Sequence, residues 1–276
     1  MKIITYLFWN LYRKNLIAPL IQLLIEDEID ICMLAECSHL DIQGLINQLK
    51  SSGHNWKLIE ICPIGDIRLL AKQSVSISVV KEEKHYSCYK LIDKGVTHML
   101  FTVHLISGMY KNEDARSQRA CNTSVVLQKI EQDVFAGQEL KSIIVGDFNL
   151  QPYSQGIAGA FGFNATMSIA KAKQKYRIVD DVKCNFYYNP IWDIMGSNNL
   201  VQGTYYNNND ETDLSIFWYS YDSVLLRPYF IDKFVWDSFK IIEESSSFKF
   251  IKSHKIDNDN FSDHLPIKFE IKEGGN

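Results

Sequence analysis

The sequence lacks the features of a membrane or secreted protein. No hydrophobic run approaches the roughly 18 uninterrupted apolar residues of a membrane span. The longest candidate, residues 16–25, is broken by Pro19 and Gln22. The apolar run at residues 2–9 is followed closely by Asn10 and Arg13 and by no small-residue cleavage site. We therefore expect a buried first strand there rather than a signal peptide.

The six cysteines include no Cys-x-x-Cys pair, and no cysteine and histidine have the spacing of zinc ligands. An even number of cysteines is compatible with a disulfide framework. A chain of 276 residues does not need such staples, however, and Cys32 lies in an apolar run that is typical of a buried strand. We therefore favour reduced cysteines and a cytoplasmic location.

The chain also lacks a strong excess of either charge. It has 33 acidic and 29 basic residues, a formal net charge of -4, and 46% hydrophobic residues. The apolar fraction is too high for a disordered chain. The mild acidity argues against a general basic coat for nucleic acid, but it allows a local phosphate site. No repeat or linker is visible, so we expect one domain over residues 1–276.

Hydrophobic periodicity indicates mixed strands with interspersed helices, which is typical of a layered α/β fold. Helices are predicted at residues 15–27, 39–50 and 114–135, the last with Val126, Ile130 and Val134 among its apolar positions. Strands are predicted at residues 2–9, 29–35, 56–61, 67–72, 75–81, 86–92, 97–105, 141–149, 221–226, 246–252 and 265–271.

Four apolar runs have polar, ligand-type residues at one end. These residues are Asn10, Glu36, the pair Asp147 and Asn149, and the pair Asp263 and His264. A strand holds its end residue rigidly, and ligands gather outside strand ends in layered α/β folds. Carboxylate and amide oxygens could hold a hard cation, and a histidine could bind or protonate a phosphoryl oxygen. Each signal alone also fits an ordinary turn.

Taken in order, these motifs resemble the endonuclease/exonuclease/phosphatase superfamily, which includes deoxyribonuclease I. The family pattern is a strand ending in Asn, a strand ending in Glu, a strand with His, Gly-Asp-x-Asn, a Tyr-Asp strand and Ser-Asp-His-x-Pro. The corresponding residues here are Asn10, Glu36, His104, Asp147 with Asn149, Asp222, and Asp263 with His264. The resemblance spans residues 3–271 and implies a four-layer α/β/β/α sandwich of two mixed β-sheets flanked by helices.

The resemblance also implies roles for the acidic and amide side chains. Glu36 would be the principal ligand of Mg²⁺ or Mn²⁺, with Asn10 and Asp263 beside the same ion. Asp147 would orient or deprotonate the attacking water. Asn149 would hold the phosphate or the nucleophile.

The histidines would handle the phosphate and its protons. His264 would contact the scissile phosphate, with Asp222 fixing its tautomer, and His104 would be a second phosphate-binding or proton-donating histidine. Asp66, just before the strand predicted at residues 67–72, could orient His104. A histidine in an apolar strand is otherwise a core residue, which is how we interpret His98.

Three further features are less decisive. Arg116 and Arg119, near the start of the long helix, could contact substrate phosphate or lie on a solvated face. Ala35 stands where the family usually has Gln before the metal-binding Glu, which could loosen Glu36. The residues Lys171, Lys173, Lys175 and Arg177 could follow a phosphate backbone or form one solvated helix face.

The resemblance implies a divalent-metal-dependent phosphodiesterase that attacks with activated water. The Gln-Pro-Tyr-Ser segment after Asn149 favours a nuclease or nucleotide phosphodiesterase. A phosphomonoesterase or a lipid- or inositol-headgroup phosphoesterase is the alternative, and an inactive binding protein is disfavoured by the intact motif set. Aromatic residues within 155–220 could stack nucleobases or simply pack between the sheets. We expect a monomer that holds nucleic acid or nucleotide locally, at a cleft.

Overall fold

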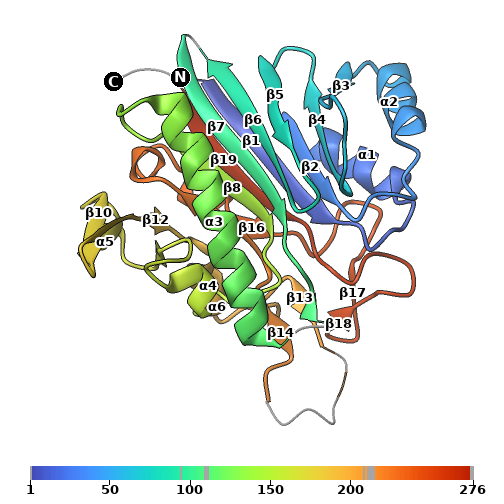
Figure 1. Cartoon of the computed structure of the whole chain (residues 1–276). Coiled ribbons are helices and arrows are strands. Elements are labelled where there is room, and N and C mark those ends of the chain that lie inside the picture. The colour runs from blue at the N-terminus through green and yellow to red at the C-terminus, as the bar shows by residue number, and fades with distance from the viewer. Residues whose placement is uncertain (1, 94, 109–111, 208, 210–214, 274–276) are drawn as a thin grey trace.

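Two large mixed β-sheets form the centre of the computed structural model, which describes residues 2–93, 95–108, 112–207, 209 and 215–273 (Figure 1). One sheet has six strands in the order β16-β19-β1-β2-β4-β3, and the other has seven in the order β5-β6-β7-β8-β15-β12-β9. Each sheet combines antiparallel pairs with a parallel pair, such as β1 with β2 and β7 with β8.

The six-stranded sheet consists of β1 (Lys2–Asn10), β2 (Ile31–Ala35), β3 (Trp56–Leu58), β4 (Ile67–Lys72), β16 (Lys240–Ile241) and β19 (Ile267–Glu273). The seven-stranded sheet consists of β5 (Ile77–Glu82), β6 (Tyr86–Asp93), β7 (Val96–His104), β8 (Ser142–Asp147), β9 (Ala165–Thr166), β12 (Tyr187–Tyr188) and β15 (Asp222–Leu226).

Three longer helices cover the sheets: α1 (Ile17–Glu26), α2 (Ile42–Ser51) and α3 (Glu113–Phe135). The shorter helices are α4 (Gln155–Ala158), α5 (Ile169–Ala172), α6 (Ile191–Met195) and two 3₁₀ turns, Pro228–Phe230 and Trp236–Ser238. The remaining short strands are β10 (Tyr176–Val179), β11 (Val182–Asn185), β13 (Tyr205–Tyr206), β14 (Trp218–Tyr219), β17 (Ile251–Lys252) and β18 (Lys255–Ile256).

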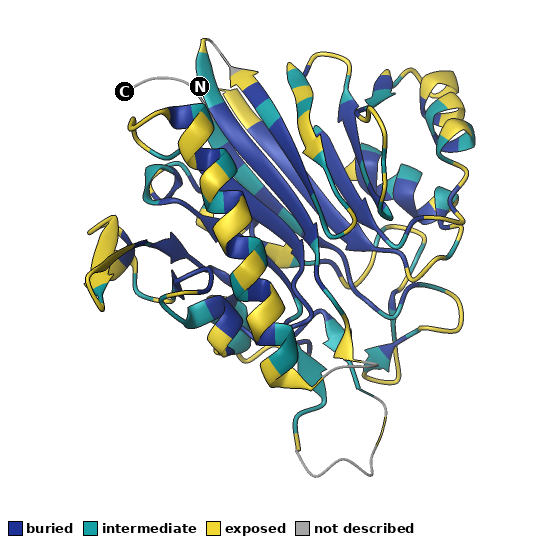
Figure 2. Ribbon diagram, in the orientation of Figure 1, coloured by how far each residue is buried: buried dark blue, intermediate teal, exposed yellow. Residues whose placement is uncertain are grey.

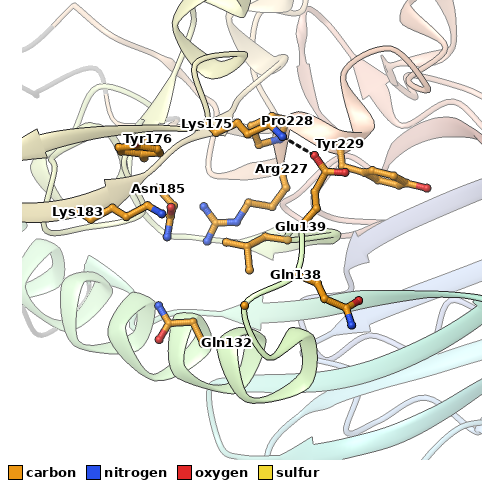
Figure 3. Close-up of a pocket in the computed structure, with 12 residues that line it drawn as sticks. Gln132, Gln138, Glu139, Lys175, Tyr176, Lys183, Asn185, Arg227, Pro228 and Tyr229 are labelled. Carbon is orange, nitrogen blue, oxygen red and sulfur yellow. Dashed lines mark hydrogen bonds and ion pairs between the residues drawn. The ribbon is translucent and has the colours of Figure 1, made fainter.

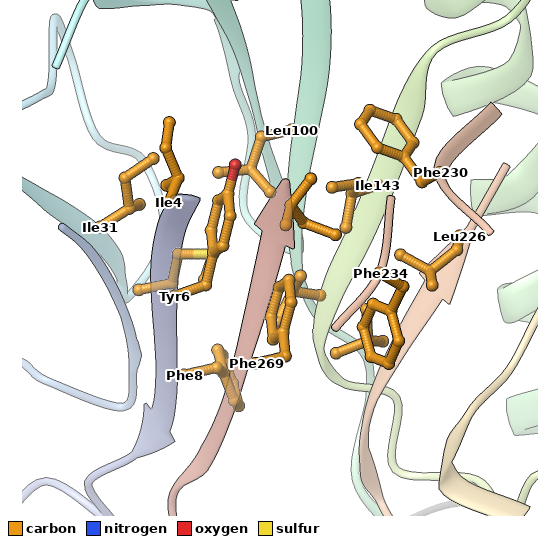
Figure 4. Close-up of a cluster of buried hydrophobic side chains, with 14 of the residues drawn as sticks. Ile4, Tyr6, Phe8, Ile31, Leu100, Ile143, Leu226, Phe230, Phe234 and Phe269 are labelled. Atoms are coloured by element: carbon orange, nitrogen blue, oxygen red, sulfur yellow. The ribbon is translucent and has the colours of Figure 1, made fainter. Parts of the chain in front are cut away.

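The first strand shows why the sequence forms layers. Successive strand side chains point to opposite faces. Ile4, Tyr6 and Phe8 therefore join the core between the two sheets, whereas Leu7 and Trp9 join the core under the helices. Figure 4 shows the first core, in which Tyr6, Phe8 and Phe269 of the six-stranded sheet lie in one cluster with Leu100, Ile143 and Leu226 of the seven-stranded sheet. Fully burying a side chain of this size contributes about 1.5–3 kcal/mol.

Two outer cores complete the layers. Leu20, Leu23 and Leu24 of α1 and Leu45 and Leu49 of α2 pack on the outer face of the six-stranded sheet. On the seven-stranded sheet, α3 presents a buried stripe and an exposed stripe (Figure 2), as expected for an amphipathic helix. The order helix, sheet, sheet, helix confirms the predicted four-layer α/β/β/α sandwich.

The buried stripe of α3 differs from the one predicted. Val126 is 39% exposed, and Leu127 and Glu131 are buried instead. Glu131 accepts hydrogen bonds from Arg227, which is also buried, and from the hydroxyl of Ser142. A charged residue therefore occupies a core position of the helix. A prediction from apolar residues alone places the buried face of α3 about one residue away from its position in the structure.

Two predicted strands are shorter than expected or nearly absent. The strand expected at 56–61 is limited to β3, and of the strand expected at 246–252 only β17 forms, paired with β18 outside the large sheets. The other predicted strands and the three long helices are present, with ends shifted by a few residues. Within the described residues, no helix combines the length and apolar character of a membrane span. All six cysteines are free thiols.

Candidate active site

Strand register brings three predicted residues of the seven-stranded sheet into one row. In the neighbouring strands β7 and β8, which run parallel, His104 lies opposite Asp147. In β15, which pairs with β8 on its other side, Asp222 also lies opposite Asp147. Asp147 is 1% exposed and Asp222 is fully buried. The ends of three neighbouring strands thus place one imidazole and two carboxylates together.

The six-stranded sheet adds the next two residues. Asn10 ends β1 and pairs in register with Ala35, the last residue of β2. Glu36 follows with φ +47°, a left-handed conformation that turns the chain away from the strand. The Nδ2 of Asn10 donates a hydrogen bond of 3.0 Å to Oδ2 of Asp147. This bond joins the ends of the two sheets at the site.

Asn149 supports Asp147 from within the same turn. Its backbone N–H donates to Oδ1 of Asp147 at 2.8 Å, and its Nδ2 donates to Oδ2 at 3.0 Å. The Nδ2 also donates to the carbonyl of Leu105 at 2.9 Å. Asn149 has φ +51°, which asparagine tolerates better than most residues. The Gly-Asp-Phe-Asn segment is therefore a turn, and that turn fixes the orientation of the Asp147 carboxylate.

His264 and Asp222 form a buried pair. The Nδ1 of His264 lies 2.7 Å from Oδ2 of Asp222, so Nε2 is left to face the site, 4.0 Å from Oδ2 of Asp147. The backbone carbonyl of His264 accepts a bond of 2.8 Å from Nε1 of Trp9. Its N–H donates to Oγ of Ser262, which in turn donates to the carbonyl of Asn10. Asp222 thus holds the imidazole, and Trp9 and Ser262 hold the backbone of His264.

His104 lies beside Glu36, as the motif order implied. Its Nε2 is 3.5 Å from Oε1 of Glu36 and 3.8 Å from Oδ2 of Asp147. Arg13 contacts the other side of Glu36, with Nε 3.5 Å from Oε2. Among the described residues, no hydrogen bond or ion pair joins Asp66 to His104, so the suggestion that Asp66 orients His104 is not confirmed. The hydrogen bonds of the His104 backbone go to His85 instead.

The charges of the site reinforce one another. Burial would lower the pKa of His264, but Asp222 and Asp147 outweigh that effect and raise it to about 10. Burial would also lower the pKa of His104, but Glu36 and Asp147 outweigh that effect and raise it. The hydrogen bond from His104 is the main reason why the pKa of Glu36 is lowered. His264 therefore favours the imidazolium form at neutral pH, and the acidic neighbours of His104 shift its equilibrium toward the imidazolium.

A divalent cation fits the remaining oxygens. Burial raises the pKa of Asp263 to about 6, and its Oδ1 is buried without a hydrogen-bond partner among the described residues. The close group of three ligand atoms in the described chain is Asp147, Asp222 and His264, which lie within 4.8 Å of one another. In that group, Oδ2 of Asp147 accepts from two amides and Oδ2 of Asp222 is bonded to His264, whereas Oδ1 of Asp222 has no hydrogen-bond partner among the described residues. Glu36 and Asp263 are the better candidates for metal ligands, because magnesium is usually held by one or two carboxylates together with water.

The two arginines of α3 differ in position. Arg116 donates through Nη1 to the carbonyl of Asn149, and its guanidinium also hydrogen-bonds the side chain of Tyr221. It therefore braces the Gly-Asp-Phe-Asn turn instead of lying on a solvated face. Arg119 is exposed and lies close enough to His85 to help lower the pKa of that imidazole, although burial of His85 is the main cause.

The aromatic residues of segment 155–220 divide into two groups. Tyr187 and Tyr188 are buried in the core. Tyr205 and Tyr219 instead form a ring cluster with Tyr221 near His264. The ring of Tyr205 lies 5.1 Å from the imidazole of His264. The packing interpretation is therefore confirmed for Tyr187 and Tyr188, and stacking of nucleobases on Tyr205 and Tyr219 stays a prediction.

Two lysines of the predicted basic cluster are paired with acidic side chains. Lys173 pairs with Asp232, and Lys175 pairs with Glu139. Arg177 donates to the side chain of Asn164. These charges point to separate partners. His98, interpreted as structural, is buried against the ring of Phe230 at 5.2 Å.

A cavity of about 330 Å³ lies at the other end of β8 (Figure 3). Lys175, Tyr176, Lys183 and Arg227 line it, and the figure shows the Lys175–Glu139 ion pair across it. It adjoins the Ser142 end of β8, because Arg227 donates its N–H to the carbonyl there, whereas Asp147 ends the same strand. It is therefore separate from the candidate active site.

Several residues of the site had no recognisable signal in the sequence. Arg13 contacts Glu36, and Lys14 donates to the carbonyls of Asn258, Asp259 and Phe261 in the loop before Asp263. Both are single basic residues in a turn after a strand. Only Trp9 and Ser262 could have been inferred, because they adjoin motif residues.

Comparison with solved structures identifies the fold. A truncated TDP2 from Caenorhabditis elegans is 16% identical, covers 98% of both chains and has a TM-score of 0.58. The 3′ phosphatase NExo from Neisseria, bound to a product DNA hairpin, is 13% identical over 98% of this chain and 100% of that chain, with a TM-score of 0.57. The endonuclease domain of TRAS1, a telomere-specific non-LTR retrotransposon, is 11% identical over 99% and 100%, with a TM-score of 0.54.

No family model matches the sequence, and no curated protein matches it significantly. The structural likeness, at these identities, concerns the fold. The chain has the fold of the endonuclease/exonuclease/phosphatase superfamily, also called the deoxyribonuclease I-like fold. The site described above lies where the strands of both sheets end, as the resemblance of the motifs implied.

Proposed function

We propose that the protein is a divalent-metal-dependent phosphodiesterase that hydrolyses nucleic acid or nucleotides. The observation that carries the proposal is the position of Asp147. Its carboxylate accepts hydrogen bonds from two amides and lies within 4.0 Å of the Nε2 atoms of both His104 and His264. An anionic phosphodiester needs both a base for water and positive charge near its oxygens, and this arrangement supplies both.

Asp147 is the group that orients the attacking water and accepts its proton. Asn10 and Asn149 hold this carboxylate in place through their Nδ2 atoms. The His264 imidazolium, paired with Asp222, donates a hydrogen bond to a non-bridging phosphate oxygen. His104 offers a second donor on the Glu36 side. Preorganised donors of this kind stabilise charge that develops in the transition state.

Glu36 and Asp263 would hold Mg²⁺ or Mn²⁺, with Asn10 beside them. A bound cation would supply further charge neutralisation at the phosphate and its leaving group. Ala35 cannot hydrogen-bond Glu36 through its side chain, so Arg13 and His104, each 3.5 Å away, and Asn10 are the side chains that orient it. The similarity of the whole chain to solved structures supports the further proposal that residues 1–276 act as one catalytic domain.

Metal removal should abolish hydrolysis. We expect bis(p-nitrophenyl) phosphate to be hydrolysed in Mg²⁺ or Mn²⁺ and not in EDTA, with recovery when the metal is restored. Glu36→Gln keeps the size of the side chain but removes its charge, so it should raise the metal concentration needed for half-maximal rate. Glu60→Gln, which removes a partly exposed carboxylate paired with Arg68, is the matched control. Hydrolysis that persists in EDTA would contradict the proposal.

A panel of substrates tests the nucleic-acid assignment. Single-stranded DNA, double-stranded DNA, RNA, cyclic dinucleotides, phosphomonoesters and phosphoinositides should be compared at equal concentration. If the protein contacts three phosphates of a single strand, the logarithm of its association constant should fall with the logarithm of the salt concentration, with a slope of about -2. A KM that does not change with salt, together with preference for a phosphomonoester or inositol headgroup, would favour the alternative substrate classes.

A further inference from the structure

A second cavity, of about 450 Å³, lies on the side of the molecule formed by α5, α6 and the loop after Asn149. We call it the distal cavity. Its walls include the aromatic rings of Tyr153, Trp192 and Phe186 and the cationic side chains of Lys171 and Arg177. Among the described residues that line it, none is acidic. The cavity therefore combines flat apolar faces with positive charge.

Of the three rings, that of Tyr153 is exposed, that of Trp192 is half-buried and that of Phe186 is buried. Tyr153 is 51% exposed, and its ring centroid is 6.4 Å from that of Trp192, at an interplanar angle of 48°. Arg177 lies over the ring of Phe186 at 5.7 Å and donates through Nε to the side chain of Asn164. Its guanidinium is thereby fixed at the wall. Planar rings beside fixed positive charge suit a nucleobase followed by a phosphate.

A line of aromatic rings runs from the candidate active site toward this cavity. The ring of Tyr205 lies 5.1 Å from the imidazole of His264. The ring of Tyr221 follows at 5.5 Å from Tyr205, and that of Tyr219 lies at 5.2 Å from Tyr221.

The loop that carries Tyr153 is tied to the end of that line. Ser220 donates its backbone N–H to Oε1 of Gln151 at 3.2 Å, and Tyr219 contributes to the raised pKa of Tyr153, after burial and Glu113. The loop that carries Tyr153 therefore lies beside the segment that carries Tyr219 and Tyr221.

We propose that the distal cavity binds a nucleobase and the adjoining phosphate of a single-stranded nucleic acid whose scissile phosphate lies at His264. This inference rests on the proposed function and adds the form and length of the substrate. A base that stacks on the exposed ring of Tyr153 needs a face free of its neighbours, which a base inside a duplex does not have. A ligand that spans both sites must be an oligonucleotide of several residues.

The cavity of Figure 3 is the contrasting case. It also contains cations, but Lys175 is paired with Glu139, and Arg227 is neutralised by Glu131. It lies at the opposite end of β8 from Asp147. Residues of that cavity therefore serve as controls for the distal cavity.

Binding of a labelled single-stranded 12-mer, followed by fluorescence anisotropy in EDTA so that no hydrolysis occurs, tests the inference. Tyr153→Leu removes one stacking face and should raise Kd roughly 5- to 150-fold. Lys171→Gln should raise Kd less and reduce the salt slope by about 0.7. The matched controls are Tyr176→Leu, an exposed tyrosine of the other cavity, and Lys173→Gln, on the same turn as Lys171.

Outcomes for the two proposals can be told apart. Kd values that are unchanged in Tyr153→Leu and Lys171→Gln, equal losses in the controls, or failure of the native protein to bind the 12-mer would overturn the distal-cavity inference. Hydrolysis of bis(p-nitrophenyl) phosphate by the native protein tests the proposed chemistry separately. If the native protein hydrolyses the substrate but its binding of the 12-mer does not depend on Tyr153, the proposed function is supported and the distal-cavity inference is overturned. Binding that depends on Tyr153, without hydrolysis, would refute the proposed phosphodiesterase activity and support the proposed binding of single-stranded nucleic acid at the distal cavity.

Discussion

Replacing His264 with alanine is expected to lower kcat/KM for a phosphodiester by roughly 10²- to 10⁴-fold, the contribution of a positioned acid–base group. That loss corresponds to about 3–5 kcal/mol of transition-state stabilisation. The reason lies in the geometry: Nδ1 is bound to Asp222, and Nε2 faces Asp147 across 4.0 Å. The rate should be measured with bis(p-nitrophenyl) phosphate and with an oligonucleotide, at saturating metal.

The role of Asp222 can be tested in the same experiment. Asp222→Asn keeps a hydrogen-bonding group but removes the charge that favours the imidazolium, so it should also slow hydrolysis strongly. Residues that act as one unit are not additive, and the double variant should therefore be little slower than His264→Ala alone. Additive losses would mean that Asp222 acts independently of His264.

The matched control is His54→Ala. His54 follows α2 and precedes β3, whose Trp56 pairs with Lys72 at the end of β4 away from Glu36. This imidazole is therefore remote from the site, and its removal should leave hydrolysis unchanged. If His264→Ala, shown to be folded by circular dichroism, hydrolyses phosphodiesters as fast as the native protein, His264 has no part in catalysis.

The motif residues of the site could be predicted because each one sits at a strand end. Strands are visible in the sequence as apolar runs, and their ends are where the chain turns polar. Asp147 is the clearest example. Its place between His104 and Asp222 follows from pairing of three strands, once the order of those strands is known. The resemblance to a family supplied that order, which hydrophobic periodicity alone does not contain.

Other parts of the site depend on contacts between distant loops. Arg13 looks like any solvated arginine, yet it lies against Glu36. Tyr153 and Tyr205 have the same local character as the buried Tyr187, and only the folded loops separate an exposed ring from a core ring. Side chains of this kind have no periodic position on a strand or helix. Their partners are set by tertiary packing, which local sequence does not encode.

The most consequential error concerned α3, and it leads to a second expected result. Glu131 and Arg227 lie 96 positions apart in the sequence, and nothing in either context marks them as buried. In the structure, Nη2 of Arg227 is 2.6 Å from Oε2 of Glu131, and Nε is 2.9 Å from Oε1. The guanidinium also lies 3.6 Å over the ring of Tyr187 and donates to the carbonyl of Phe186. The pair ties α3 to the end of the strand that begins at Asp222.

Glu131→Ala should therefore destabilise the fold by about 3–5 kcal/mol, because it leaves Arg227 buried without a counter-charge. Thermal unfolding would show this as a fall in Tm of roughly 6–15 °C. Glu139→Ala, which removes the exposed partner of Lys175, is the control and should cost less than about 1 kcal/mol. A double variant, Glu131→Leu with Arg227→Met, should recover much of the lost stability, since apolar groups of similar volume replace a buried pair well.

The same variants separate stability from chemistry. Glu131 does not contact Asp147, His264 or Glu36, and its partners are Arg227 and Ser142. Below its own Tm, the double variant should hydrolyse phosphodiesters at a rate close to that of the native protein. A double variant that is stable but slow would show that the ion pair positions β15, and with it Asp222, beyond holding the fold together. A Glu131→Ala protein as stable as the native one would show that Arg227 finds another partner or water.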